Sequence, residues 1–288
     1  MANDGKAQLQ DLLGEYWVGK LLGTGARSEV YEVKRKNDGR VFAAKFIPVR
    51  HDEDKKVIRH LENEYQVLCA THRDGDEGAE VIVRPEDFRK VRKFFSLRAA
   101  YLIEERAYGQ SLDEERDYEL YDVLTIFRRV CVGLEHLHSV GYVHADLKPH
   151  NILVAEDLTV KLIDFGFAAP VGTKLTAAKG TFGYLAPEQA GGKVTERTDV
   201  FNLGGVLYWV LTGQNIPSIM PGQHERAGFV PDAQVQITPP VQLNHDVPGE
   251  LSDMVLKCLS FNDIERPTMT KFKRYLHGLQ LRMEYDAV

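Results

Sequence analysis

A change of residue pattern near Gly109 constrains the fold of this chain more than any other feature. Before it, short apolar runs are separated by turn signals, such as the Lys-Asn-Asp-Gly sequence at 36–39, which is typical of strands joined by hairpins. After it, apolar residues recur at helical spacing. The 288 residues are enough for two cores. The pattern therefore predicts an α+β fold with a sheet-rich lobe, a helix-rich lobe and a ligand-binding cleft between them.

The first lobe is expected to be mostly sheet. Strands are predicted over residues 16–47, a helix over 55–70, and two further strands over 81–91 and 94–103. The helix is indicated by apolar residues three or four positions apart. Residues 73–80 are charged and contain glycine, which indicates a solvated loop.

The second lobe is expected to be mostly helical. A long helix is predicted where six apolar residues share one face: Val123, Ile126, Phe127, Val130, Leu134 and Leu137. Gly141 is well placed to end it. The apolar run 203–211 is about half of what spans a bilayer, so it predicts a buried helix. Residues 217–248 are proline-rich and irregular, and two amphipathic helices over 251–259 and 270–283 follow.

Composition narrows the function classes. The net charge of −6 favours neither nucleic acid nor an anionic membrane as a partner, and no segment predicts a membrane span. Residues 1–6 contain no apolar core for a signal peptide. The three cysteines, Cys69, Cys131 and Cys258, are scattered in apolar contexts, which favours reduced thiols in a cytoplasmic protein. Nothing in the sequence indicates the oligomeric state.

The segment around Asp146 carries the strongest chemical signal. Lys148 follows two residues later, Asn151 follows five residues later, and Asp164 opens an Asp-Phe-Gly triplet. Together they supply a carboxylate to position an attacking hydroxyl, a cation for a phosphate and two oxygen ligands for a hard metal ion. This set is suited to moving a phosphoryl group from a metal-bound nucleotide to an alcohol. Each residue alone could equally belong to an Asx turn or a helix cap.

Two features of the first lobe could serve the same chemistry. Gly23 and Gly25 link two predicted strands, where glycine lets backbone N–H groups approach a phosphate, although most such pairs form plain hairpin turns. Lys45 interrupts an apolar strand, so it is either an edge lysine that reaches water or half of a buried ion pair. In the second case we expect Glu64 as the partner, because Glu62 points about 160° away on the helix.

These motifs, in this order, resemble the eukaryotic-type (Hanks-type) protein kinase family over residues 16–280. The resemblance implies a bilobal kinase fold, with a sheet-rich N-lobe that contains one helix and a mainly helical C-lobe. It implies an N-terminal tail at 1–15, N- and C-lobes at about 16–105 and 108–280, and a C-terminal tail at 281–288. The polar N-terminal segment is expected to be either a mobile tail or a short extra helix.

The resemblance also implies catalytic roles. Asp146 would position the substrate hydroxyl, with Lys148 near the transferred phosphate and Thr181 bonded to both. ATP would be the phosphoryl donor, and Asn151 and Asp164 would bind Mg²⁺, with Mn²⁺ as an alternative. The catalytic set would consist of Asp146, Lys148, Lys45, Glu64 and Thr181.

Nucleotide-binding and structural residues follow from the same resemblance. The nucleotide would contact Leu22, Gly23, Thr24, Gly25, Ala26, Arg27, Ser28, Val30, Ala43, Lys45, Glu105, Ala107 and Leu153. The structural set would be Leu68, His144, Phe165, Glu188, Asp199 and Arg266. Within this set Asp199 would brace the catalytic loop, Leu68 would stack behind Glu64, and Arg266 would pair with Glu188.

The substrate class follows from two segments. The Lys148-Pro149 pair and the Gly-Thr-Phe-Gly-Tyr-Leu-Ala-Pro-Glu sequence at 180–188 resemble those of serine/threonine kinases. The expected reaction is transfer of the ATP γ-phosphoryl group to Ser/Thr hydroxyls of protein substrates. One alternative is a scaffold that binds ATP and partners without catalysis, although its catalytic residues are all present. The other is a small-molecule kinase, which the complete peptide platform at 180–188 disfavours.

One departure from the family pattern concerns regulation. Ala145 replaces the arginine that in many kinases receives a phosphate on the activation loop. Without it, a phosphate on that loop lacks its main charged partner. We therefore expect activity not to depend strongly on phosphorylation of Thr173 or Thr176.

Other departures concern the first lobe. Ser28 replaces the third loop glycine, and Glu104 stands at a position behind the nucleotide that is usually apolar or Thr, where a buried carboxylate needs a partner or a proton. His136 and His138 point to different faces of a helix, which argues against a metal site. A basic cluster lies on the predicted hairpin and forms either a solvated face or a docking site for an acidic partner or peptide. Its members are Arg84, Arg89, Lys90, Arg92, Lys93 and Arg98.

Overall fold

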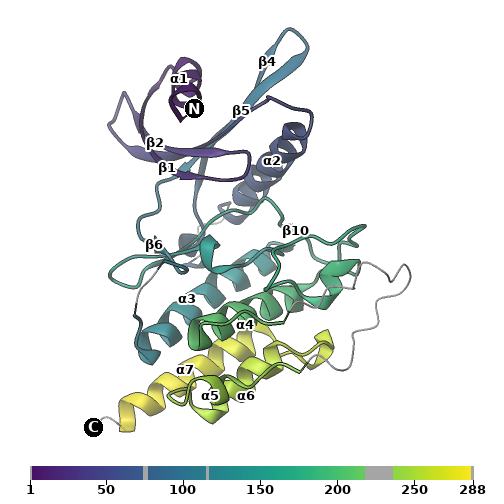
Figure 1. The fold of residues 1–288 in the computed structure, drawn as a ribbon. Coiled ribbons are helices and arrows are strands. Elements are labelled where there is room, and N and C mark those ends of the chain that lie inside the picture. Colours follow the sequence, from purple (N-terminus) through teal and green to yellow (C-terminus); the bar gives the residue numbers. More distant parts are fainter. Residues whose placement is uncertain (1, 74–76, 115–116, 218–235, 287–288) are drawn as a thin grey trace. The chain divides into compact units, whose positions relative to one another are not determined.

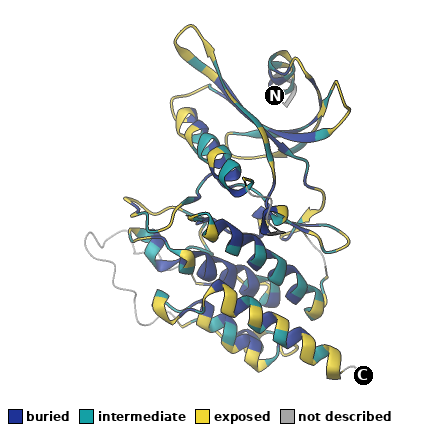
Figure 2. Ribbon diagram, turned by 180° about the vertical axis from the view of Figure 1, so that it is seen from behind, coloured by how far each residue is buried: buried dark blue, intermediate teal, exposed yellow. Residues whose placement is uncertain are grey.

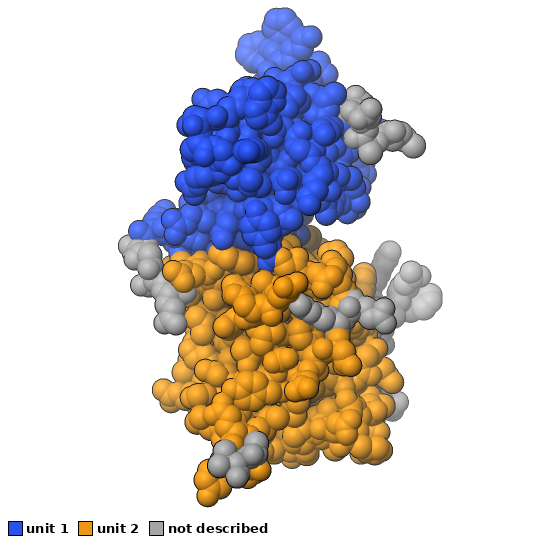
Figure 3. Space-filling view, turned by 90° about the vertical axis from the view of Figure 1, so that its left-hand side faces the viewer, with its two compact units in different colours: residues 1–75, 82–108, 164–166 blue, residues 76–81, 109–163, 167–288 orange. Residues whose placement is uncertain are grey.

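The computed structural model describes residues 2–73, 77–114, 117–217 and 236–286 (Figure 1). These residues divide into two compact units, which Figure 3 distinguishes by colour. The first unit contains residues 1–75, 82–108 and 164–166, and the second contains 76–81, 109–163 and 167–288. The predicted α+β class is confirmed, since the first unit is rich in strands and the second in helices.

The first unit is built on an antiparallel sheet in the order β1-β2-β3-β5-β4. The strands are β1 (Tyr16–Thr24), β2 (Glu29–Arg35), β3 (Val41–Pro48), β4 (Pro85–Lys93) and β5 (Ser96–Glu105). Two helices accompany them, α1 (Ala2–Leu12) and α2 (Asp54–Thr71). Figure 1 shows the two helices on different sides of the sheet.

One face of this sheet forms an apolar core with the N-terminal segment. Tyr31, Phe42 and Ala44 belong to that core, together with Leu9 of α1 and Leu13 just after it. Because side chains alternate along a strand, these residues share one face. The polar N-terminal segment therefore forms a helix that covers the sheet, which was one of the two expectations.

The opposite face carries the residues of chemical interest. Lys45 pairs in register with Val30 on β2 and with Leu102 on β5, and Ala43 pairs with Glu104. Residues opposite each other in an antiparallel pair project from the same side of the sheet. The register therefore places Val30, Ala43, Lys45 and Glu104 on one face, which is also the side that α2 contacts.

The second unit is mainly helical. Its α-helices are α3 (Leu120–Ser139), α4 (Glu196–Thr212), α5 (Pro240–Leu243), α6 (Gly249–Cys258) and α7 (Met269–Asp286). Its short strands are β6 (Gln110–Ser111), β7 (Tyr142–Val143), β8 (Ile152–Val154), β9 (Val160–Leu162) and β10 (Ala169–Pro170). Its described residues also form the 3₁₀ helices η1 (Glu77–Val81), η2 (Pro149–Asn151), η3 (Pro187–Ala190) and η4 (Asp263–Glu265).

Helix α4 is the most deeply buried helix of this unit (Figure 2). Its N-terminus is capped by Thr195, and it ends at Gly213, which adopts a left-handed φ of 70°. Gly204 allows a close approach, because a Cβ atom there would lie 2.7 Å from Cβ of Cys258 on α6. The burial of the predicted run 203–211 is thereby confirmed.

Several boundaries differ from the sequence-based expectations. Strand β4 begins at Pro85 rather than at residue 81, since proline lacks the N–H that a strand interior needs and suits a first position. The helix expected over 270–283 runs to Asp286, so most of the expected C-terminal tail is helical. Of the irregular segment 217–248, residues 218–235 lie outside the described residues. None of the helices in the described part of the chain has the length and apolar character needed to cross a bilayer.

Candidate functional site

The first unit contains a buried ion-pair cluster around Lys45. Its Nζ atom lies 2.8 Å from Oε2 of Glu64 and 3.0 Å from Oδ1 of Asp164. Glu64 is buried, whereas Glu62 pairs outside the cluster with Lys90, at 2.6 Å. The helix periodicity of α2 thus selects Glu64, as expected. Burial lowers the pKa of Lys45, but the carboxylates of Asp164 and Glu64 outweigh burial and raise the pKa above its ordinary value, so the ammonium is charged.

The Asp-Phe-Gly triplet belongs to this same unit. The backbone N–H of Phe165 donates to Oε1 of Glu64 at 3.2 Å, and the Phe165 side chain is fully buried. Asp164 adopts a positive φ of 64°, a conformation that costs a non-glycine residue of order 1–3 kcal/mol and that accumulates at functional sites. Leu68, one turn after Glu64, is also fully buried.

Glu104 is a buried acid next to this cluster. Burial, reinforced by the carboxylate of Glu64, raises the pKa of Glu104 to about 8, although Lys45 partly offsets both effects. Its Oε2 atom accepts no hydrogen bond from any residue that the structure describes. The sequence analysis expected a buried Glu104 to need either a partner or a proton. With this pKa, Glu104 holds a proton at neutral pH.

We expect Glu104→Gln to gain stability relative to the wild type as pH rises. The folded-state pKa of Glu104 is about 8, above the ordinary 4.5. Between these pH values the unfolded chain has lost the proton of Glu104 and the folded chain still holds it, so the stability of the wild type falls as pH rises. Glutamine does not titrate and escapes this loss. Urea unfolding at pH 5 and pH 9 measures the difference. Glu156→Gln, at an exposed position, is the matched control and should show no such trend. An equal difference at both pH values would contradict the prediction.

The glycine-containing link between β1 and β2 is tied to helix α2. Gly25 N–H donates to the Ser28 carbonyl at 2.8 Å, which closes the turn. Arg27 Nη1 lies 2.6 Å from Oδ1 of Asp54, whose other oxygen accepts the N–H groups of Arg50 and His51. Nothing in the local pattern predicted this ion pair, which joins the tip of the loop to the first turn of α2.

The Arg27–Asp54 pair should contribute a measurable coupling energy. Asp54 is buried and Arg27 is about one-third exposed, so we expect a coupling of about 1 kcal/mol in a double-mutant cycle with Arg27→Ala and Asp54→Asn. Unfolding free energies of the four proteins give this value. Lys55→Ala, which removes an exposed pair with Asp52 at the same helix end, should change stability by less than half as much. Additive effects of the two substitutions would refute the coupling.

Residues 105–107, at the end of β5 and just after it, include two of the expected nucleotide contacts, Glu105 and Ala107. Ala107 N–H donates to the Glu105 carbonyl at 3.0 Å, and Glu105 N–H donates to the Arg84 carbonyl at 2.8 Å. These two residues are therefore bonded to each other through their backbones, and a nucleotide that used the same two groups would replace that hydrogen bond.

The second unit holds Asp146 in a defined orientation. Thr181 Oγ1 donates to its Oδ1 atom at 2.8 Å, and Lys148 Nζ lies 3.3 Å from its Oδ2 atom. Lys148 is also 3.3 Å from Thr181 Oγ1, so both contacts expected of Thr181 are present. Asn151 Nδ2 donates to the Asp146 carbonyl at 3.0 Å, which fixes the Asn151 side chain beside the same loop.

Asp199 braces the loop that carries Asp146. Its buried carboxylate accepts the N–H groups of His144 and Ala145, each at 2.9 Å, and lies 2.7 Å from Nε2 of His138. Burial alone would raise the pKa of Asp199, but these hydrogen bonds, first that from His138, hold it below its ordinary value. Ala145 keeps a positive φ of 58°, so the brace supports a strained residue.

Two residues that support the same loop were not among the residues singled out from the sequence for this role. His138, which was considered only as a metal ligand, is instead a partner of Asp199. Gln189 is fully buried and donates to the carbonyls of Ala145 at 2.6 Å and Lys179 at 2.9 Å. Its position next to the expected Glu188 was the only available signal.

The expected pairing of Glu188 with Arg266 is present. Arg266 donates to both oxygens of Glu188, at 2.8 and 2.9 Å, and its side chain is fully buried. It also donates to the carbonyls of Ser260 and Arg197 and lies over the ring of Phe201.

The sequence-predicted residues thus fall into two groups. The first unit contains Lys45, Glu64, Leu68, Asp164, Phe165, Glu105, Ala107, Ala43 and the 22–30 segment. The second unit contains Asp146, Lys148, Asn151, Leu153, Thr181, His144, Glu188, Asp199 and Arg266.

Comparison with known proteins places these motifs in context. Residues 16–276 match the family described as "Protein kinase domain". Over 282 residues the chain is 31% identical to the serine/threonine-protein kinase PknB of Mycolicibacterium smegmatis, covering 89% of this chain and 41% of that protein. It is 27% identical over 262 residues to a probable serine/threonine-protein kinase of Clostridium perfringens, covering 87% of this chain and 36% of that protein. It is 32% identical over 207 residues to the serine/threonine-protein kinase TIO of Arabidopsis thaliana, covering 69% of this chain and 15% of that protein. The chain therefore spans less than half the length of each of these relatives.

Proposed function

The chain belongs to the Hanks-type protein kinase family, and from this premise we propose that it transfers the γ-phosphoryl group of ATP to Ser/Thr hydroxyls of proteins. The observation that carries the proposal is the Asp146 carboxylate, held by Thr181 and Lys148. A carboxylate held in one orientation accepts a hydrogen bond from an incoming hydroxyl and directs its oxygen toward phosphorus. The Ser/Thr preference is supported by Lys148 and by the relatives named above.

We assign the nucleotide to residues of the first unit and Leu153. The Lys45 ammonium, kept charged by Glu64 and Asp164, is suited to the phosphates. Backbone N–H groups of the 22–30 segment would donate to the same phosphates. The backbone hydrogen bond between Ala107 and Glu105 would be exchanged for one to adenine.

We propose Asn151 and Asp164 as the ligands of Mg²⁺, with Mn²⁺ as an alternative. Both supply the oxygen atoms that these hard cations prefer. The Asn151 amide nitrogen is engaged with the Asp146 carbonyl, so its oxygen is the atom left for a metal, and the Asp164 side chain is more than one-third exposed. A bound ion would neutralise charge on the phosphates of the nucleotide.

We also propose a cytoplasmic location. Cys69, Cys131 and Cys258 form no disulfide among themselves, which suits a reducing compartment. Fractionation of the native cells, with detection of the protein in soluble and membrane fractions, addresses this point directly.

We propose that apolar contacts hold the activation loop in place of the phosphate-binding arginine. Ala145 is buried in a cluster with Val143, Leu175 and Val194. Leu175 N–H donates to the Gly192 carbonyl at 2.9 Å, so the loop is also held through its backbone. These interactions involve no phosphate and support activity without loop phosphorylation.

The double variant Thr173→Ala/Thr176→Ala should therefore keep its phosphoryl-transfer rate to within about threefold. The Thr173 hydroxyl already donates to the Pro170 carbonyl at 2.6 Å, and Thr176 is exposed. Leu175→Asp is the contrasting variant, because a charge in the apolar cluster should lower the rate at least about tenfold. Initial rates with a peptide substrate measure both. A loss of tenfold or more in the threonine variant, with folding intact, would refute the hypothesis.

The function itself is tested by transfer of labelled γ-phosphate from ATP with Mg²⁺. The acceptors are the protein itself, generic basic proteins and small alcohols, and mass spectrometry locates the phosphate. We expect incorporation on Ser and Thr of proteins. Transfer only to alcohols would favour a small-molecule kinase, and no transfer despite ATP binding in a thermal-shift assay would favour a scaffold.

A further inference from the structure

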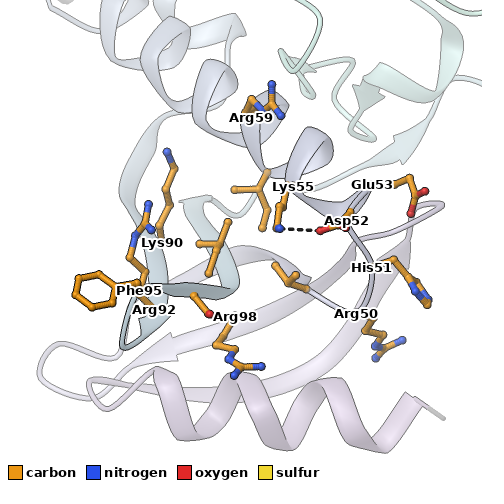
Figure 4. A pocket seen from close by; sticks show the side chains of 14 residues that line it. Arg50, His51, Asp52, Glu53, Lys55, Arg59, Lys90, Arg92, Phe95 and Arg98 are labelled. Carbon is orange, nitrogen blue, oxygen red and sulfur yellow. Dashed lines mark hydrogen bonds and ion pairs between the residues drawn. The ribbon is translucent and has the colours of Figure 1, made fainter.

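The first unit contains a pocket that the proposed catalytic function does not use. It lies between the β4–β5 hairpin, the N-terminal half of α2 and the segment 49–53, and its volume is about 930 Å³ (Figure 4). In Figure 4, Lys90, Arg92 and Phe95 stand on the hairpin side, and Arg50 and His51 stand on the other.

Positive charge dominates the lining of this pocket. Six lysines and arginines face two carboxylates, Asp52 and Glu53. The cations are Arg50, Lys55, Arg59, Lys90, Arg92 and Arg98. The pocket lining therefore carries a net positive charge, although the whole chain has a net charge of −6. Lysines and arginines are thus concentrated at this pocket.

The four arginines are the cations available to a ligand. Lys55 is paired with Asp52 at 2.7 Å, and Lys90 is paired with Glu62 at 2.6 Å. Across the residues that the structure describes, Arg50, Arg59, Arg92 and Arg98 take part in no salt bridge. Arginine forms bidentate contacts with carboxylates and is enriched at protein interfaces.

Apolar atoms lie between these charges. Ile58 is almost fully buried, and Val49 and Leu97 are partly buried in the pocket wall. At the rim, Phe95 is 96% exposed, next to Phe94, which is 91% exposed. Two neighbouring exposed aromatic side chains beside a pocket are typical of a surface that a partner covers.

We propose that this pocket, the basic pocket, docks an acidic peptide segment of a partner protein. Carboxylates of the segment pair with the arginines, and one apolar side chain contacts the floor near Ile58. The arginines stand on three separate elements, namely the 49–53 segment, α2 and the hairpin, which suits several carboxylates along a peptide. Nucleic acid is disfavoured because Asp52 and Glu53 lie in the same lining.

Peptide binding to the full chain tests this proposal without any phosphoryl transfer. The probe is a fluorescein-labelled peptide with the core Glu-Glu-Phe-Glu-Glu, and its affinity is measured by fluorescence anisotropy at two salt concentrations. Peptides with Gln-Gln-Phe-Gln-Gln and Glu-Glu-Ala-Glu-Glu cores separate the charged from the apolar contribution. The pocket variant is Arg92→Glu/Arg98→Glu, and the control is Arg89→Glu/Lys93→Glu, which changes the charge equally on the same hairpin outside the pocket.

We expect the Glu-Glu-Phe-Glu-Glu peptide to bind to the wild type, with an affinity that falls as the salt concentration rises. Its affinity for the pocket variant should be lower by at least about tenfold. The control variant should bind within about twofold of the wild type, and both altered peptides should bind more weakly. Equal losses in the two variants would mean unspecific attraction and would overturn the proposal. Unchanged affinity in the pocket variant, or no binding of the acidic peptide, would overturn it as well.

Discussion

Asp146→Asn is expected to lower the phosphoryl-transfer rate by about 10²–10⁴-fold while leaving the fold intact. Asparagine keeps the shape of the side chain and can still contact Thr181 and Lys148, which now hold the Asp146 carboxylate. It cannot accept the proton of a substrate hydroxyl. Initial rates at saturating ATP, with a Ser/Thr peptide as acceptor, measure the change.

The control for this variant is Asp253→Asn, an equal chemical change at an exposed position on α6. It should keep the wild-type rate. ATP should still raise the melting temperature of Asp146→Asn, because Asp146 is not among the proposed nucleotide contacts. A rate of Asp146→Asn within tenfold of the wild type would show that another group performs its role.

Arg266→Met is expected to lower the unfolding free energy of the second unit by about 3–5 kcal/mol. The substitution keeps an unbranched side chain of moderate size but removes both hydrogen bonds to Glu188, which leaves that carboxylate without its cation. The carbonyls of Ser260 and Arg197 lose a donor as well. Leaving buried polar groups without partners is among the substitutions that destabilise a protein most.

Unfolding of the second unit can be followed alone. The chain has two tryptophans, Trp17 on β1 of the first unit and Trp209 on α4 of the second. In a Trp17→Phe background, urea unfolding monitored by fluorescence reports on Trp209. The control is Arg282→Met, which removes an exposed pair with Glu250 and should cost less than about 1 kcal/mol. An equal loss of unfolding free energy in the two arginine variants would contradict the prediction that the buried Arg266–Glu188 pair matters more than the exposed Arg282–Glu250 pair.

Local pattern predicted most of the longer elements and singled out the chemical residues. Helices α2, α3, α6 and α7 and the strands of the first unit follow the apolar periodicity, because a helix or strand exposes one face to a core at a fixed spacing. The Asp146 and Asp164 motifs are short, so their internal geometry is set by a few consecutive residues. The choice of Glu64 over Glu62 followed from the same rule.

Tertiary structure revealed contacts between distant residues that the motifs did not indicate. His138 and Gln189 were missed because their partners, Asp199 and the Ala145 carbonyl, lie 61 and 44 positions away, and no local period relates them. The raised pKa of Glu104 depends on burial and on a carboxylate from another element.

The sequence by itself determined most of the longer elements, the order of the motifs and the identity of the catalytic candidates, because these depend on periodicity and on neighbouring residues. It also showed that the hairpin is basic. Only the tertiary structure decided that Arg92 and Arg98 line a pocket with Arg50 and Arg59, while Arg89 and Lys93 do not. That distinction arises from strand alternation combined with the packing of α2 beside β4 and β5, which brings side chains from three elements around one hollow.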